Sequence, residues 1–423
     1  MSENQLSAGV LEKNKLFEDV FDGKVPERVP RLVFGDNAFC LEYAGYDLRK
    51  EQYSLVKNLD AIDQATKDFD SDVVFGMFLR MPHLYKMLEA INFVMGTDGF
   101  IQHPEVQGLK DDEYDDFIAD PIKTLWDKVL PRLYPALAKP GFEGQKALSK
   151  AFYTFFTSMG VMQQGFGKIA EKYDKSVYSM APAASCTPLD ILSDQLRSFS
   201  GISTDMRRRP EKVEAACNAL LPVAIKAGSG PNANRYVRTF IPLHMAPYMR
   251  EKDFKRFYWP TFKAYVEALD ARGIGANLFV EHDWMRYLDY LNELPPLTHM
   301  SFEFGDPKLI AEKVGKRHVI SGLYPLTLLK TGTEQQCICL LYTSLKALGI
   351  IEFFHRLDQA EISLLNEIQK GHPTAHIAFG NADNQTQVGL SQLFLGFVIA
   401  CFHTLGDAHF LLRGQERHLA DFL

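Results

Sequence analysis

The 423-residue sequence has no excess of basic charge, few cysteines and no long apolar run. Lysine and arginine number 46 against 53 aspartates and glutamates, which gives a net charge of −7 and argues against nucleic acid as the main partner. No stretch approaches the roughly 18 consecutive apolar residues of a membrane span. The first 15 residues are polar and lack the apolar centre of a signal peptide. We therefore expect a cytoplasmic protein with neither a membrane nor a nucleic-acid partner.

Cysteines and nucleotide-binding loops are also scarce. The six cysteines are scattered, and we expect them to be free, mostly buried thiols: Cys40, Cys186, Cys217, Cys337, Cys339 and Cys401. No G-x-G-x-x-G sequence joins a strand to a helix, and no G-x-x-x-x-G-K-[ST] loop occurs. These absences disfavour the open-sheet nucleotide-binding folds.

Short apolar runs alternate with longer amphipathic stretches through most of the chain. The clearest candidate strands are residues 31–34, 72–75, 236–243, 276–280, 298–304 and 318–321. The intervening candidate helices include residues 210–226, 253–272, 284–294 and 307–314. Such alternation predicts a parallel sheet covered by helices. We expect an α/β protein with a (β/α)8 TIM barrel, and a doubly wound open sheet is the second option.

Two regions depart from this alternation. Residues 111–175 read as helical apart from a break at Pro140, and we expect an insertion lying over one end of the sheet. After residue 341 there is one of the 21 prolines but six of the 12 histidines, and helix-like pieces replace the strands. Residues 339–344 also resemble a translated sequencing adapter. We therefore divide the chain into a barrel, 1–341, incomplete at its C-terminal end, and an atypical helical tail, 342–423, foreign to the natural gene.

A barrel places its working residues at the carboxyl ends of its strands. There the sequence has His244, then Glu281, His282 and Asp283, and, after the first strand, Asp36. Histidine titrates near neutrality, so proton transfer is one expected role. His244 and Glu281 alternatively suit a zinc or other divalent ion. In the third interpretation they are ordinary loop residues, with Asp283 capping the next helix.

Charged residues also cluster before the helix that begins at Pro210. Arg207 suits an acidic ligand, or else belongs to a solvated helix start. Asp205 is a candidate for substrate contact, or else a cap of the following helix.

Several segments, in order, resemble the uroporphyrinogen decarboxylase superfamily. The clearest are residues 196–213 (LRSFSGISTDMRRRPEKV) and 279–284 (FVEHDW), and the others are 26–30, 253–260, 286–295, 320–322 and 331–334. The similarity extends over about residues 10–340. It implies a (β/α)8 barrel and one of two reactions. Decarboxylases of the superfamily remove carboxylates from uroporphyrinogen without a cofactor. Their relatives move methyl groups between a corrinoid protein and a thiol or another carrier, usually with zinc.

The chain departs from the motifs of both branches. Residues 35–40 lack the paired arginines of the decarboxylases, whose catalytic aspartate, tyrosine and serine would fall near Met77, Asp194 and His244. Glu281 stands where the first zinc-binding cysteine of the methyltransferases would be.

Three functions remain open at this point. The leading prediction is methyl transfer to or from a corrinoid protein. Its predicted catalytic residues are His244, Glu281 and Asp283, and its predicted zinc ligands are His244 and Glu281. The residues predicted to contact a small-molecule substrate are His282, Arg207, Asp205 and Asp36. The alternatives are decarboxylation of uroporphyrinogen or another carboxylated substrate, with His244 as proton donor, and a catalytically silent or truncated barrel. The aromatic helix 253–272 could also form a homodimer.

Overall fold

A computed structural model describes residues 6–324, apart from 34, 78–79, 179–183 and 231, together with 328, 331–333 and 335–336. The predicted tail, the adapter-like string and three of the cysteines, Cys337, Cys339 and Cys401, lie outside the described residues. The other three, Cys40, Cys186 and Cys217, are free and buried as expected. In the described part of the chain, no helix is both long enough and apolar enough to cross a membrane.

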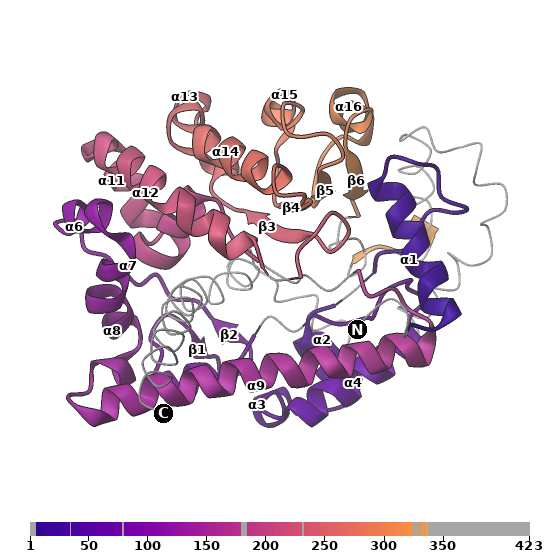
Figure 1. The fold of residues 1–423 in the computed structure, drawn as a ribbon, viewed down its shortest axis with the longest axis horizontal. Helices are drawn as coiled ribbons and strands as arrows, with labels where there is room; N and C mark the ends of the chain where they lie inside the picture. Colours follow the sequence, from indigo (N-terminus) through magenta and orange to yellow (C-terminus); the bar gives the residue numbers. More distant parts are fainter. Residues whose placement is uncertain are drawn as a thin grey trace, which may run out of the picture.

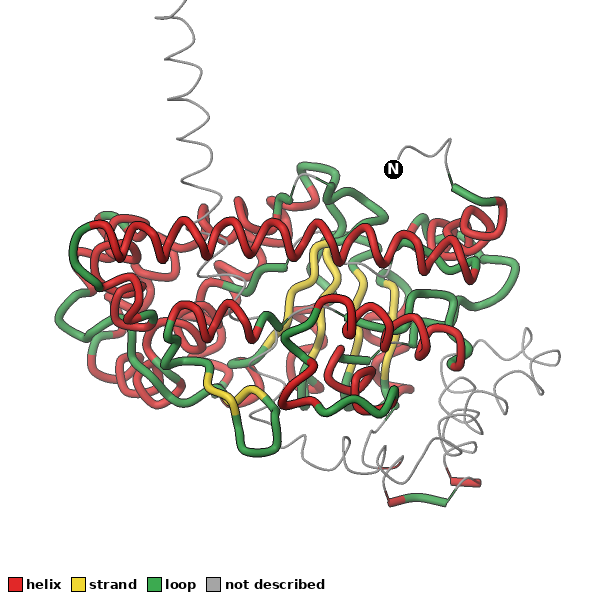
Figure 2. The backbone as a smooth tube through the Cα atoms, turned by 90° about the horizontal axis from the view of Figure 1, so that it is seen from below, coloured by secondary structure: helices red, strands yellow, loops and turns green. Residues whose placement is uncertain are grey.

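A parallel four-stranded sheet forms the centre of the molecule, and its strands follow chain order (Figures 1 and 2). The strands are β3 (Thr239–Leu243), β4 (Ala276–Val280), β5 (His299–Phe302) and β6 (Val319–Gly322). In register, Leu243 lies opposite Val280, and Val280 lies opposite Phe302. Four of the six predicted strands are therefore confirmed.

The other two predicted strands, 31–34 and 72–75, do not form regular ladders. Val73, within the second of these, makes an isolated parallel bridge with Ser176, and another bridge joins Asp36 to Met77 just beyond the two segments. A further bridge joins Ala184 to β3. The physical reason is a contact between the two segments, because the Ser71 side chain bonds both the N–H and the carbonyl of Val33 in place of a strand neighbour. The fold is thus a mixed α/β structure with a parallel sheet.

Helices occupy most of the N-terminal half of the described chain, with one hairpin of strands among them. These elements are α1 (Ala8–Phe21), α2 (Asn37–Tyr43), α3 (Leu48–Glu51), α4 (Leu55–Asp68), α5 (Pro82–Leu88), β1 (Val94–Met95), β2 (Ile101–Gln102), α6 (Tyr114–Ala119), α7 (Pro121–Thr124), η2 (Leu125–Val129), α8 (Leu130–Leu133), η3 (Pro135–Ala138) and α9 (Phe142–Tyr173). The hairpin β1–β2 is antiparallel.

The C-terminal half supplies the helices between and beside the strands. They are α10 (Pro188–Asp190), η4 (Ile191–Arg197), α11 (Phe199–Arg208), α12 (Pro210–Gly228), η5 (Ala246–Tyr248), α13 (Glu251–Asp253), η6 (Phe254–Tyr258), α14 (Trp259–Asp270), η7 (Met285–Tyr287), α15 (Leu288–Leu291), α16 (Pro307–Ile310) and η8 (Ala311–Gly315). All four predicted helical segments are present, and 253–272 is a continuous helical run made of α13, η6 and α14. Its aromatic face is buried within the same chain, since Phe254, Tyr258 and Phe262 are fully covered.

The predicted insertion is helical, with its break between η3 and α9, but its last helix does not cover an end of the sheet. The 32-residue α9 packs along α4 and α5 on the outside of the molecule (Figure 1). Its buried face includes Phe155, Met162 and Phe166, at spacings of seven and four residues. An amphipathic stripe of this length needs a long partner surface, which the neighbouring helices provide.

Helix α1 lies against the amino ends of the strand segments. Phe17 and Phe21 form a buried cluster with Val73, and Tyr178, Tyr236 and Val319 pack around it. The guanidinium of Arg238 lies 4.0 Å from the centre of the Phe21 ring, and the His299 ring lies 5.8 Å from it. Residues from five separate segments thus converge on the last turn of α1, at the amino ends of the strands.

Candidate functional site

Three acidic or basic residues follow three adjacent strands at the same level. His244, Glu281 and Glu303 come directly after residues that lie opposite one another in the sheet. Side chains alternate along a strand, so these three point to the same side, opposite to the buried Leu278 and Met300. The carboxyl edge of the sheet therefore carries one imidazole and two carboxylates close together.

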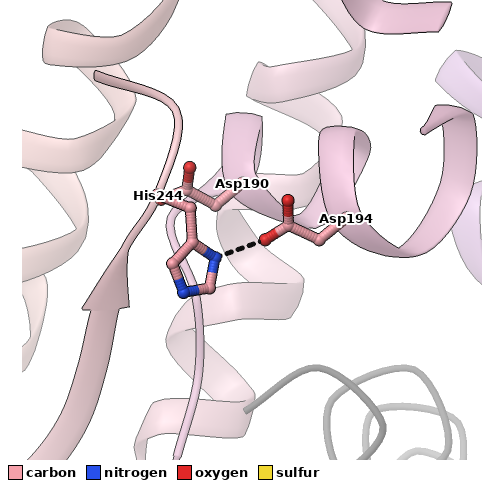
Figure 3. A group of neighbouring side chains, drawn as sticks. All are labelled: Asp190, Asp194 and His244. Carbon is pink, nitrogen blue, oxygen red and sulfur yellow. Dashed lines mark hydrogen bonds and ion pairs between the residues drawn. The ribbon is translucent and has the colours of Figure 1, made fainter. Parts of the chain in front are cut away.

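His244 lies between two carboxylates, and all three side chains are nearly inaccessible to solvent. Its Nδ1 is 2.5 Å from Asp194 Oδ2, and its Nε2 is 3.3 Å from Glu281 Oε1 (Figure 3 shows the first contact). The side chains of His244, Asp194 and Glu281 are 5%, 7% and 4% exposed. Nε2 has no well-aligned hydrogen bond within the described chain. The Nδ1–H is thus committed to Asp194, while Nε2 faces the end of β4.

The two carboxylates keep the imidazole charged. Burial by itself lowers the pKa of His244, but the carboxylates of Glu281 and Asp194 outweigh it and hold the pKa well above its ordinary value. The ring is consequently an imidazolium at neutral pH, and its Nε2–H is a proton that can be transferred.

Asp190 supports this arrangement from the side. Its Oδ1 accepts a hydrogen bond from the backbone N–H of Met245 at 2.9 Å, and its Oδ2 accepts from the hydroxyls of Tyr258 at 2.6 Å and Thr187 at 2.9 Å. Complete burial raises its pKa to about 6, while the His244 charge and the hydrogen bonds oppose that rise. Asp190 thereby fixes the backbone that immediately follows His244.

The part of the chain that the structure describes does not complete a zinc site. Among the described residues, Asp190, Asp194 and His244 are the group whose donor atoms lie near enough, within 4.8 Å of one another. However, the two carboxylate oxygens of Asp190 together already accept three hydrogen bonds. The Nδ1 atom of His244 is likewise bonded to Asp194. On the other side, His244 Nε2 and Glu281 offer two donors, whereas protein zinc sites use three or four. Metal binding by His244 and Glu281 therefore stays a prediction, and no catalytic step is assigned to zinc.

The next two residues after Glu281 bond to groups other than the imidazolium. His282 has a left-handed backbone, with φ of 60°, and its N–H donates to Glu303 Oε2 at 2.9 Å. Its Nε2 lies 2.9 Å from the hydroxyl of Tyr248, at the end of η5. Asp283 is exposed, and its Oδ1 accepts from the backbone N–H of Met285 at 2.8 Å. This bond spans two residues and does not make Asp283 the N-cap of η7, which is Trp284 without a side-chain cap bond. The catalytic role of Asp283 stays a prediction.

The remaining predicted substrate-binding residues lie on other elements. Asp205 is 1% exposed, and its Oδ2 accepts from Arg197 Nε at 2.7 Å and from the Tyr114 hydroxyl at 2.9 Å. It does not cap α12, whose first turn has no side-chain cap. Asp36 caps α2 through the N–H of Ala38 at 2.7 Å.

Arg207, at the end of α11, is exposed and lines a pocket of about 710 Å³. The structure thus brings His244 and Glu281 together, with His282 alongside, while Arg207, Asp205 and Asp36 stand on other elements.

Asp190, Asp194, Tyr248 and Glu303 were not among the predicted site residues. The two aspartates are four residues apart, a spacing that places side chains on one face of a helix. Paired acids at this spacing in an otherwise apolar segment, PLDILSDQL, are the signal that could have identified them. Glu303 directly follows β5, so the strand-end rule that selects Glu281 points to it as well, although it was not chosen as a site residue.

No family model and no curated protein matches the chain. Among solved structures, the chain is similar to a methyltransferase from Methanosarcina mazei, with a TM-score of 0.48 and 11% sequence identity. The similarity covers 77% of this chain and 89% of that one.

Proposed function

We propose that the chain is an enzyme in which the His244 imidazolium acts as a general acid, and that its reaction is methyl transfer between a small molecule and a corrinoid carried by a partner protein. The observation that carries the proposal is the buried contact of His244 with both Asp194 and Glu281 at the carboxyl edge of the sheet. The choice of methyl transfer rests on the sequence motifs, and so does the expectation of a (β/α)8 barrel that is incomplete at its C-terminal end.

The chain's own residues supply and hold the proton. Asp194 accepts Nδ1–H, which fixes the orientation of the ring and directs Nε2–H toward the strand ends. When the bond between the methyl carbon and the leaving O, N or S atom breaks, its electron pair passes to that atom, which takes the Nε2 proton. Glu281 and Asp194 stabilise the imidazolium until transfer. The corrinoid supplies the acceptor of the methyl group.

Decarboxylation is the second candidate, because the same proton has a use there. Loss of carbon dioxide leaves an electron pair on the substrate carbon, and Nε2–H can protonate that carbon. The absence of arginine from residues 35–40 makes a substrate as highly charged as uroporphyrinogen less suitable. A catalytically silent barrel is disfavoured, because a buried charged array is costly to maintain without a use.

The test compares the full-length chain with His244→Asn and Glu281→Gln. We expect demethylation of methylcobalamin by a thiol or a phenol, the reverse of the step described above, followed by its absorbance change. Positioned acids contribute roughly 10²–10⁴-fold to rates, so His244→Asn should reduce kcat by about that factor. His83→Asn, on α5, is the matched control and should retain the wild-type rate.

Full activity of His244→Asn would contradict the role of this residue. Absence of turnover with every acceptor would contradict methyl transfer, and release of carbon dioxide from uroporphyrinogen would establish the second candidate instead.

A further inference from the structure

A pocket of about 710 Å³ lies between α11 and the segment that follows β3. Small-molecule sites in proteins commonly have about 300–1,000 Å³, so its size suits an organic ligand better than a single ion. Its walls come from α11, the start of α12, η5, α13 and η6. All of these elements except α13 contain buried residues.

The floor of the pocket is apolar and rigid. Met245, Met249 and Phe257 are 2–3% exposed and contribute to the lining. At the rim, Phe199 and Tyr248 are 43% and 56% exposed, and their rings meet edge to face at 5.3 Å. Such a surface favours the flat or aliphatic body of a ligand, because burying it removes apolar area from water on both sides.

Positive charge surrounds this apolar floor, and half of it is uncompensated. Arg250 pairs with Asp253 at 2.9 Å, and Arg256 pairs with Glu214 at 3.0 Å. Arg207 and Lys252 also line the pocket, and neither makes an ion pair within the described chain.

Two free cations beside an apolar floor are therefore available to an anionic group, which Arg binds through a planar fork and Lys as a point charge.

The pocket adjoins the imidazolium site. Met245, in its floor, follows His244 directly and is held by Asp190 at 2.9 Å. Tyr248, at its rim, contacts His282 at 2.9 Å, and the negative charges of Glu281 and Glu303 contribute to the raised pKa of the Tyr248 hydroxyl, after burial. A ligand in the pocket would thus lie beside the residues that hold the catalytic array.

We infer that this pocket binds an amphipathic organic anion, a molecule with an aromatic or aliphatic body and a carboxylate that pairs with Arg207 and Lys252. The site is independent of the proposed methyl transfer, because binding is measured without turnover.

Isothermal titration calorimetry of the full-length chain with 1-naphthoate and with its neutral analogue 1-naphthamide tests the inference. We expect naphthoate to bind at least tenfold more tightly than the amide. Arg207→Ala/Lys252→Ala should weaken naphthoate at least tenfold and leave the amide unchanged, whereas Phe199→Ala should weaken both.

The matched control is Arg208→Ala/Lys255→Ala, which removes two exposed cations from the same helices outside the pocket. Naphthoate affinity should be unchanged there. Equal losses of naphthoate affinity in both double variants would show that naphthoate responds only to the overall positive charge of the surface. That result would overturn the inference. Equal affinity for acid and amide, or no binding of naphthoate, would overturn it as well.

Discussion

The buried carboxylate of Asp72 should contribute far more to stability than that of Asp70, two residues earlier. Asp72 is 1% exposed and accepts two hydrogen bonds from Arg28, at 2.5 and 2.6 Å, and one from the Arg31 N–H at 2.6 Å. Removing one partner of such a pair costs about 3–5 kcal/mol. Asparagine retains one acceptor and Arg28 can still reach water, so we expect Asp72→Asn to lower the free energy of unfolding by about 3 kcal/mol at pH 7.

The pH dependence has a defined sign. Burial raises the pKa of Asp72, but the Arg28 and Arg31 hydrogen bonds outweigh it and hold the pKa below its ordinary value. The stabilisation is therefore complete above the unfolded carboxyl pKa, about 3.9, and is lost as the pH falls through the lower folded value. Urea unfolding followed by circular dichroism at pH 7, 5 and 3 should show wild type and Asp72→Asn converging only in acid.

Asp70→Asn is the matched control. Asp70 pairs with Arg31 but is 37% exposed, so its loss should cost less than about 1 kcal/mol. Equal destabilisation by the two substitutions would refute the reasoning from burial. A difference between wild type and Asp72→Asn that stays constant from pH 7 to pH 3 would refute the assigned linkage.

Three further predictions concern the candidate site. Asp194→Asn should lower the pKa of His244, measured by NMR titration of the ring signals, and an unchanged titration would exclude Asp194 as the main partner. Tyr258→Phe removes a hydrogen bond that lowers the pKa of Asp190, so that pKa should rise further and urea unfolding should show a loss of about 1 kcal/mol. Asp283→Ala removes the bond from the Met285 N–H, so it should cost about 1 kcal/mol yet leave kcat within threefold; a larger fall in kcat would assign Asp283 a catalytic role.

Sequence periodicity was sufficient to predict the central strands and their helices. In β4, Leu278 and Val280 are buried and alternate with partly exposed residues, and the predicted bounds agree with the structure. Residues 31–34 and 72–75 have similar composition, but Ser71 and Asp72 bond their neighbours' backbone with side chains. These side-chain bonds to the backbone form only because two segments meet in space. Strand propensity is a property of each segment alone and cannot predict that contact.

For the site, the strand-end rule identified His244 and Glu281 and could not identify Asp194. A residue that ends a strand has its place determined by the sheet, whereas Asp194 reaches the imidazole only through the packing of η4 beside β3. Asp205 shows the converse, because an acid next to basic residues looks like a ligand contact until its buried bond to Arg197 is seen. The local sequence does not show which charged residues will pair with one another in the folded chain.

The position of α1 has a consequence for the order of events during synthesis. Its last turn contacts Arg238 and His299, more than 200 residues later in the chain, and the Phe21 carbonyl accepts from Arg235 at 3.2 Å. Helix α1 leaves the ribosome before these strands and therefore waits, with Phe17 and Phe21 exposed, until the strands that cover it have been made. Such distant contacts slow folding and prolong exposure to aggregation, so a chaperone that holds early chains should improve the yield of folded protein.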